Sequence, residues 1–170
     1  MAELARRRLR LDQVWLLVSP GNPLKPVAGM ASLAARLDSA RRIADGRRIV
    51  ATAIESTFGT RYTADTLAVL RRRFPRARFV WLMGADSLEQ LPRWRRWQQI
   101  AACMPFAVVP RPTYNQRALA GQAAHRLRRA RRAARLAPAL AGMVPPAWVF
   151  LPAPQHAASA SAIRAAHPAA

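Results

Sequence analysis

Short apolar runs alternate with longer amphipathic stretches along the chain. The runs over residues 14–18, 48–54, 79–84, 106–109 and 147–151 have the length of strands. Between the early runs, apolar residues recur at helical spacing, over about 30–44 and about 63–74. This alternation predicts an α/β fold, with a parallel sheet covered by helices on both faces.

Further helices are expected around this core. Residues 2–10 carry arginines in what would be the last turns of a helix, and short helices are predicted over 87–91 and 95–102. Residues 116–135, rich in alanine and arginine, are predicted to form one long helix. Thr63 is predicted to cap the amino end of the helix that it begins.

The stretch 79–97 carries the strongest indication of a site. Its apolar run stops at Gly84, and Asp86 follows two positions later. In open α/β sheets, ligands bind at the carboxyl ends of the strands. Because glycine lets a ligand approach the backbone closely, Asp86 is predicted to hold a ligand at this edge of the sheet.

Length and charge narrow the classes of protein. A chain of 170 residues suits a single domain over 1–170. Its 28 basic and 8 acidic residues give a formal charge of +20, which favours an anionic partner, although a G+C-rich genome also yields abundant arginine and alanine. Cys103 is the only cysteine, which excludes a disulfide framework within the chain, and neither a signal peptide nor a spanning segment is expected from the sequence. A cytoplasmic location is expected.

The sequence contains four short motifs whose order along the chain indicates a family. They are PGNPLK at 20–25, RYTADTL at 61–67, GADSLEQLPRW at 84–94 and SASAIR at 159–164. In this order they resemble the bacterial nicotinate-nucleotide adenylyltransferases, over nearly the whole chain. The resemblance implies a Rossmann-like nucleotidyltransferase domain that joins ATP to nicotinate mononucleotide and releases deamido-NAD and pyrophosphate. It also implies Mg²⁺, held mainly by the phosphates of ATP.

The resemblance assigns three residues to the mononucleotide. Asp86 would hold ribose hydroxyls, Trp94 would stack on the pyridine ring, and Thr63 would help to fix the pyridine carboxylate. Simpler interpretations remain open, because Asp86 could cap the helix at Ser87, and Trp94 could serve packing only. A second aromatic often follows in the family, whereas arginine follows Trp94 here.

The same resemblance assigns four residues to the phosphates of ATP. Ser159 and Ser161 would offer hydroxyls and helix-start amides, and Arg164 would add a charged fork one turn later. Lys25, the chain's only lysine, would reach phosphate from a proline-rich loop. An ordinary helix cap and a solvated surface lysine are the alternatives.

The family also carries a first strand and a GxFxPxHxGH loop at its amino end, and this sequence has no such motif. Its histidines, His125, His156 and His167, all lie in the second half, and His125 is expected to be exposed. A late start is therefore expected, with the central strand of the sheet missing and two neighbouring strands unpaired on one edge. No catalytic residue is identified, and the competence of the chain is left open.

Two other functions remain open at this point. One is a related nucleotidyltransferase that acts on another mononucleotide or on phosphopantetheine. The motifs at 61–67 and 84–94 together favour a pyridine nucleotide instead. The other is an arginine-rich nucleic-acid-binding module that uses residues 126–135 and 71–73. A solvated helix face explains those arginines, so neither nucleic acid nor a membrane is expected as a partner. The sequence does not indicate an oligomeric state.

Overall fold

Strands alternate with helices in the computed structural model, which describes residues 1–21 and 31–153. The elements are α1 (Ala2–Leu9), β1 (Val14–Leu17), α2 (Leu33–Ile43), β2 (Ile49–Thr52), α3 (Ile54–Phe58), α4 (Thr63–Arg73), β3 (Trp81–Gly84), α5 (Ala85–Gln90), η1 (Leu91–Arg93), α6 (Trp97–Cys103), β4 (Phe106–Val109), α7 (Asn115–Ala120), α8 (Gln122–Arg126), η2 (Arg128–Ala130), β5 (Arg131–Arg132), η3 (Ala134–Gly142) and β6 (Trp148–Phe150). The predicted α/β fold is confirmed.

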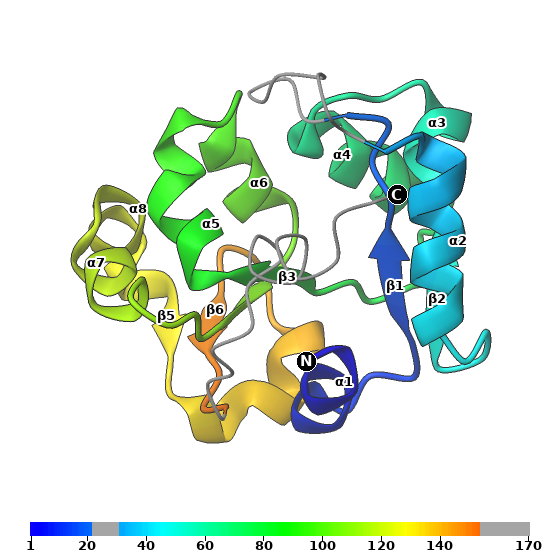
Figure 1. Cartoon of the computed structure of the whole chain (residues 1–170). Helices are drawn as coiled ribbons and strands as arrows, with labels where there is room; N and C mark the ends of the chain where they lie inside the picture. The colour runs from blue at the N-terminus through cyan, green and yellow to red at the C-terminus, as the bar shows by residue number, and fades with distance from the viewer. Residues whose placement is uncertain (22–30, 154–170) are drawn as a thin grey trace.

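A four-stranded parallel sheet forms the centre of the molecule (Figure 1). Its strand order is β3-β4-β6-β5, and each neighbouring pair runs in the same direction. Gly84, the last residue of β3, lies beside Val109, the last residue of β4. The carboxyl ends of these two strands are therefore level at one edge of the sheet.

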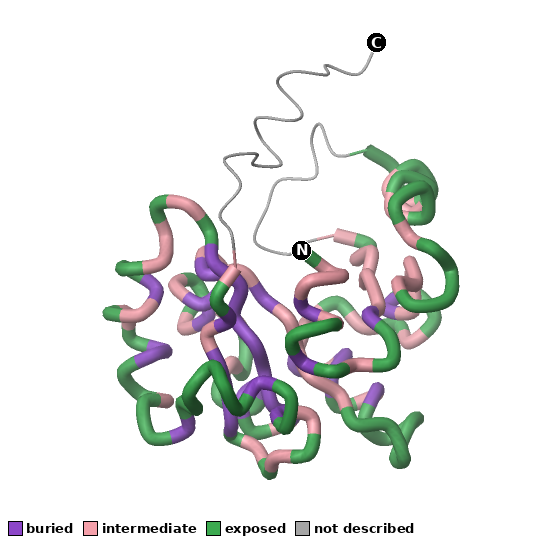
Figure 2. The backbone as a smooth tube through the Cα atoms, turned by 90° about the horizontal axis from the view of Figure 1, so that it is seen from below, coloured by how far each residue is buried: buried purple, intermediate pink, exposed green. Residues whose placement is uncertain are grey.

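Helices cover both faces of this sheet because alternate residues of each strand point to opposite sides. Phe106 and Val108 of β4 join a core with residues of α4 to α8, whereas Ala107 and Val109 join a second core with α1 and η3. The ring of Phe106 stacks on that of Trp148 at 5.6 Å, and burial of each such side chain contributes about 2–3 kcal/mol. Figure 2 shows the buried residues gathered along these strands.

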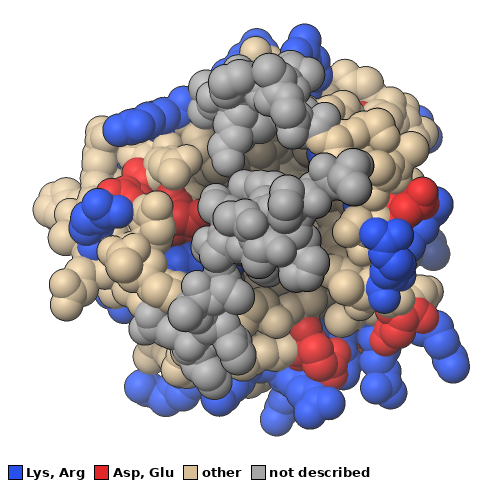
Figure 3. Space-filling view, viewed as in Figure 1, with Lys and Arg blue, Asp and Glu red and all other residues tan. Residues whose placement is uncertain are grey.

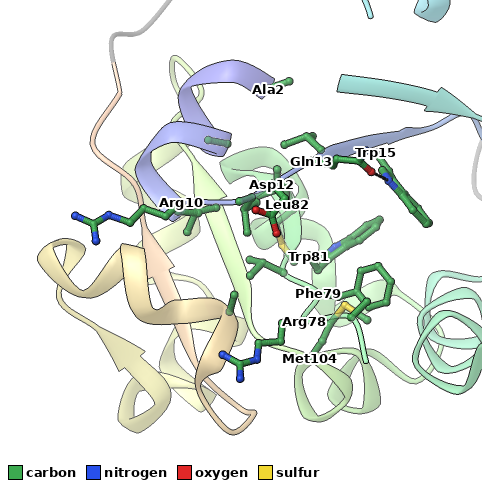
Figure 4. A pocket seen from close by; sticks show the side chains of 18 of the residues that line it. Ala2, Arg10, Asp12, Gln13, Trp15, Arg78, Phe79, Trp81, Leu82 and Met104 are labelled. Carbon is green, nitrogen blue, oxygen red and sulfur yellow. Dashed lines mark hydrogen bonds between the residues drawn. The ribbon is translucent and has the colours of Figure 1, made fainter. Parts of the chain in front are cut away.

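A second sheet contains only β1 and β2, which also run parallel. Between β1 and β3 lies a groove of about 1310 Å³, lined by every residue of both strands. Trp15 of β1 faces Phe79 across one end of the groove, with ring centroids 5.9 Å apart (Figure 4). Within residues 1–21 and 31–153, no strand pairs with the groove-facing edges of β1 and β3.

The prediction of one long helix over residues 116–135 is wrong. That stretch forms α7, α8, η2 and β5, with an extended residue at Gly121, and it leads into η3. The indole N–H of Trp148 donates to the carbonyl of Leu127 at 2.9 Å, and so takes an acceptor that a continuous helix would use. Tertiary packing against β6 therefore overrides the helical propensity of the alanines.

Several boundaries also differ from the prediction. Residues 54–58 form α3, which was not predicted and begins at the end of the strand predicted over 48–54, and β3 begins at Trp81, two residues later than predicted. No helix in the described ranges is both long and apolar enough to cross a membrane.

Candidate active site

Asp86 lies at the carboxyl end of β3, in the first turn of α5. The residue that precedes α5 as its cap is Gly84, and no side chain caps this helix by a hydrogen bond, so Asp86 is not the simple cap that was one interpretation. One carboxylate oxygen, Oδ1, is buried and has no hydrogen-bond partner among the described residues. The side chain as a whole is 40% exposed, so the carboxylate is open on its other side.

Arg111 lies beside Asp86 at the end of β4. Its Nε atom is 3.7 Å from Asp86 Oδ1, and its side chain is 47% exposed. No sequence motif pointed to Arg111. The signal that could have found it is its position, since it follows Val109 by two residues just as Asp86 follows Gly84.

Thr63 is half-buried and is the first residue of α4. The prediction that it caps this helix is wrong, because the capping position belongs to Tyr62 and no side chain caps α4 by a hydrogen bond. Tyr62 contributes its carbonyl, which accepts the backbone N–H groups of Asp65 and Thr66 at 3.0 and 3.1 Å. The chain turns into the helix one residue earlier than the hydroxyl-rich motif suggests.

Buried hydrogen bonds hold the beginning of α4 on the preceding turn. The Thr66 hydroxyl, 1% exposed, donates to the Glu55 carboxylate at 3.1 Å and lies 2.9 Å from the Thr60 hydroxyl. Glu55 is itself only 8% exposed. Because a buried carboxylate needs donors, this network fixes the α3–α4 turn that precedes Thr63. No sequence motif pointed to this network, because Glu55 lies between the strand predicted over 48–54 and the helix predicted over about 63–74.

Trp94 follows η1 and is partly buried against the core that α4, α5 and α6 share. The next two residues join this corner to the start of α4. The guanidinium of Arg95 lies over the Tyr62 ring at 4.6 Å from its centroid, and Arg96 Nη1 lies 3.3 Å from Asp65 Oδ1. The segments that carry Thr63 and Trp94 are therefore in contact, whereas Asp86 is linked to Arg111.

Other predicted site residues do not add to this picture. Lys25, Ser159, Ser161 and Arg164 lie outside the described residues. His125 lies on α8 and is exposed, as expected. No group of three or more histidine, cysteine, aspartate or glutamate side chains that could hold a metal ion occurs in residues 1–21 and 31–153.

The arginines that suggested a nucleic-acid footprint do not share one helix. Residues 126–135 extend over α8, η2, β5 and the start of η3, because the predicted helix is broken. On the face that Figure 3 shows, basic side chains are spread around the rim and are interspersed with acidic ones. Arg71 instead donates to the carbonyl of Cys103 at 2.7 Å. This arrangement fits a solvated surface.

A parallel sheet with helices on both faces is typical of α/β proteins that bind ligands, nucleotides among them, at the carboxyl ends of the strands, which is where Asp86 and Arg111 lie. The family described as cytidylyltransferase-like matches residues 1–166. The chain belongs to this family and is therefore a nucleotidyltransferase by descent.

Similar proteins agree with this class. The chain is 61% identical over 165 residues to a probable nicotinate-nucleotide adenylyltransferase of Gluconacetobacter diazotrophicus, a match that covers 97% of this chain and 77% of that protein. Proteins of the same name from Gluconobacter oxydans and Bradyrhizobium sp. (strain ORS 278) are 58% and 51% identical, over 96% and 94% of this chain and 84% and 83% of their own lengths. The resemblance inferred from the motifs is confirmed.

Proposed function

We propose that this protein transfers the adenylyl group of ATP to nicotinate mononucleotide, forming deamido-NAD and pyrophosphate in the biosynthesis of NAD. The observation that carries this proposal is the shared name of relatives 51–61% identical over almost the whole chain. The order of the motifs around Thr63, Asp86 and Trp94 supports it independently.

The mononucleotide is assigned to the strand-end region. Asp86 accepts hydrogen bonds from ribose hydroxyls, since its carboxylate is open on one side and holds no other donor among the described residues. Trp94 offers an indole face to the pyridine ring. Thr63, at the positive end of α4, offers its hydroxyl and an amide of the first turn to the pyridine carboxylate. The contact between Arg96 and Asp65 keeps the segments that carry Trp94 and Thr63 together.

ATP is assigned to residues outside the described ranges, namely Lys25, Ser159, Ser161 and Arg164. Mg²⁺ enters this proposal with the phosphates of ATP, because the described residues form no cluster of acidic or histidine ligands that would hold it alone. The ion would neutralise charge on the phosphates. We also infer that the reaction takes place in the cytoplasm.

The reaction needs positioning more than it needs a reactive side chain. A phosphate oxygen of nicotinate mononucleotide forms a bond to the α-phosphorus of ATP, while the bond from that phosphorus to the bridging oxygen breaks and pyrophosphate leaves. Both reactants are anions. Holding them in line, with cationic groups around them, therefore supplies most of the catalysis.

Pyrophosphate release tests the proposal. The purified chain is incubated with ATP, Mg²⁺ and either nicotinate or nicotinamide mononucleotide, and the dinucleotide product is identified by mass. Release that requires nicotinate mononucleotide, together with deamido-NAD, is the expected result. Equal release with another mononucleotide would assign a different acceptor, and an absence of release with every mononucleotide would contradict adenylyl transfer by this chain.

A further inference from the structure

A guanidinium group lies beside the two residues that are assigned to the pyridine ring of the mononucleotide. Arg95 directly follows Trp94, and Tyr62 directly precedes Thr63. The Cζ atom of Arg95 lies 4.6 Å from the centroid of the Tyr62 ring, within the range of a cation–π contact. This contact holds a positive charge next to the start of α4, where Thr63 is the first helical residue.

The two arginines of this corner differ in how their charges are balanced. Arg96 Nη1 lies 3.3 Å from Asp65 Oδ1, so its charge is offset by a carboxylate in the first turn of α4. Arg95 forms no ion pair with a carboxylate among the described residues, and the ring that it contacts is uncharged. The charge of Arg95 is therefore available to an anion that binds at this corner.

The start of α4 favours an anion at the same place. The backbone N–H groups of a first helical turn point outward and give the amino end a partial positive charge. No side chain caps α4 by a hydrogen bond, and the capping position belongs to Tyr62, whose ring supports Arg95. A full positive charge and a helix end thus lie on adjoining residues.

We propose that the side chain of Arg95 makes this protein prefer nicotinate mononucleotide over nicotinamide mononucleotide. The inference rests on the proposed function, in which the pyridine ring binds at Trp94 and its carboxylate at Thr63. The two mononucleotides have nearly the same shape, but one carries a carboxylate on the ring and the other a neutral amide. A guanidinium beside Thr63 attracts the carboxylate and gains little from the amide, so its charge acts on the choice between them.

A purely structural role for Arg95 would have a different consequence. If its contact with Tyr62 only held the corner against α4, loss of the contact would weaken both mononucleotides to the same degree. An electrostatic role acts on the carboxylate alone. Because Arg95 is exposed, salt would also screen its charge, whereas salt leaves a packing contact unchanged. The ratio of the two dissociation constants, measured at two salt concentrations, therefore distinguishes the two roles.

Isothermal titration of the whole chain with each mononucleotide tests the inference without requiring turnover. Arg95→Gln should weaken binding of nicotinate mononucleotide by about 3- to 10-fold and change that of nicotinamide mononucleotide by less than about twofold. Arg95→Lys keeps the charge and should keep most of the preference. Raising the salt from about 0.05 to about 0.5 M should reduce the preference more in the wild type than in Arg95→Gln. Circular dichroism confirms that each variant is folded.

Two other arginines provide matched controls. Arg72 is exposed on the last turn of α4, about 14 Å along the helix from Thr63 at a rise of about 1.5 Å per residue, so salt screens its charge there. Arg72→Gln should bind both mononucleotides as the wild type does. Arg61 is exposed and directly precedes Tyr62. An equal loss of preference in Arg61→Gln would mean that the general positive field decides the choice, and would overturn the role of Arg95.

The outcomes separate this inference from the proposed function. If the wild type prefers nicotinate mononucleotide and Arg95→Gln keeps that preference, or weakens both mononucleotides equally, Arg95 does not determine the choice and the proposed function stands. If the preference depends on Arg95 but the wild type releases no pyrophosphate from ATP with either mononucleotide, the inference stands and the proposed reaction is wrong. If the wild type binds both equally tightly, or binds neither, the inference is overturned together with the proposed acceptor.

Discussion

Gly84 is the residue at which one added methyl group would disturb the candidate site most directly. Gly84→Ala places Cβ against Asp86 Oδ1 and the Arg111 side chain. Since the backbone at Gly84 has φ −79°, alanine fits the backbone itself, and the disturbance falls on the two side chains. We expect KM for nicotinate mononucleotide to rise about tenfold or more, as an overpacking cost of about 1–3 kcal/mol would produce. Steady-state kinetics measures this change.

Gly46 supplies the opposite control. It has φ +70°, and a Cβ there would meet nothing within 4 Å. Gly46→Ala should therefore lower the free energy of unfolding by about 1–2 kcal/mol through backbone strain, and should leave KM unchanged. If Gly84→Ala also lowered stability without any effect on KM, the glycine would serve folding and not the site.

The sequence revealed Asp86, Thr63 and Trp94 as candidates because each stands in a recognisable motif. It did not reveal Arg111 or Glu55. Their significance depends on which side chains lie beside them, and those neighbours come from other elements, 25 and 11 residues away along the chain. Spacing along one segment carries no information about such pairs.

At the scale of elements, the buried contact between Thr66 and Glu55 supports the start of α4. Thr66→Val keeps the shape of the side chain but removes the hydroxyl that donates to Glu55 at 3.1 Å. The buried carboxylate then loses a donor, which should lower the free energy of unfolding by about 1–3 kcal/mol in urea denaturation. KM for nicotinate mononucleotide should also rise, because the turn before Thr63 loosens.

Thr57→Val is the matched control, since Thr57 lies on α3 and is exposed. It should change the free energy of unfolding by no more than about 0.5 kcal/mol. A Thr66→Val variant as stable as Thr57→Val would show that the buried hydrogen bond contributes nothing.

The turn between α2 and β2 should make stability depend on pH. Asp45 Oδ1 accepts the backbone N–H groups of Arg47, Arg48 and Ile49 at 2.9, 2.7 and 2.8 Å. These bonds, that of Ile49 foremost, lower the pKa of Asp45 below its ordinary value of 3.8. Because the folded pKa is the lower one, the stabilisation is present above about pH 4 and is lost as the pH falls through the folded pKa.

Asp45→Ala should therefore melt at a lower temperature than the wild type at about pH 7, and the difference should shrink below about pH 3. Glu3 adds a similar acid dependence, since hydrogen bonds from Arg6 and then Arg7 lower its pKa to about 2. Calorimetry at several pH values measures both effects. A difference between Asp45→Ala and the wild type that stays constant down to pH 2 would mean that the carboxylate charge is not involved.

At the scale of the whole molecule, the sequence predicted the parallel α/β class but not how the sheet is assembled. The apolar runs mark each main strand, because strands buried on both faces need them. Strand order, by contrast, depends on which edges meet. In the sheet, β6 lies between β4 and β5. The strand β5 has two residues, both arginines, so no apolar run marks it in the sequence.

The groove between β1 and β3 gives a prediction for backbone exchange. On the side of β2, the N–H of Val14 donates to the carbonyl of Arg48 at 2.8 Å. On the side of β4, the N–H of Trp81 donates to the carbonyl of Pro105 at 2.9 Å. Successive amides of a strand point to opposite sides, so the N–H groups of Trp15 and Leu82 face the groove. We expect these two amides to exchange with deuterium roughly 100-fold or more faster than those of Val14 and Trp81.

The strand β4 is the internal control, because β3 and β6 pair with its two edges. Its neighbouring amides, Phe106 and Ala107, should both exchange slowly, so the alternation seen in β1 and β3 should be absent there. Exchange followed by NMR resolves each position. If the amides of Trp15 and Leu82 exchanged as slowly as those of Val14 and Trp81, the groove-facing edges would be paired in solution, by another part of the chain or by a second copy. The two sheets would then be joined through that groove into one.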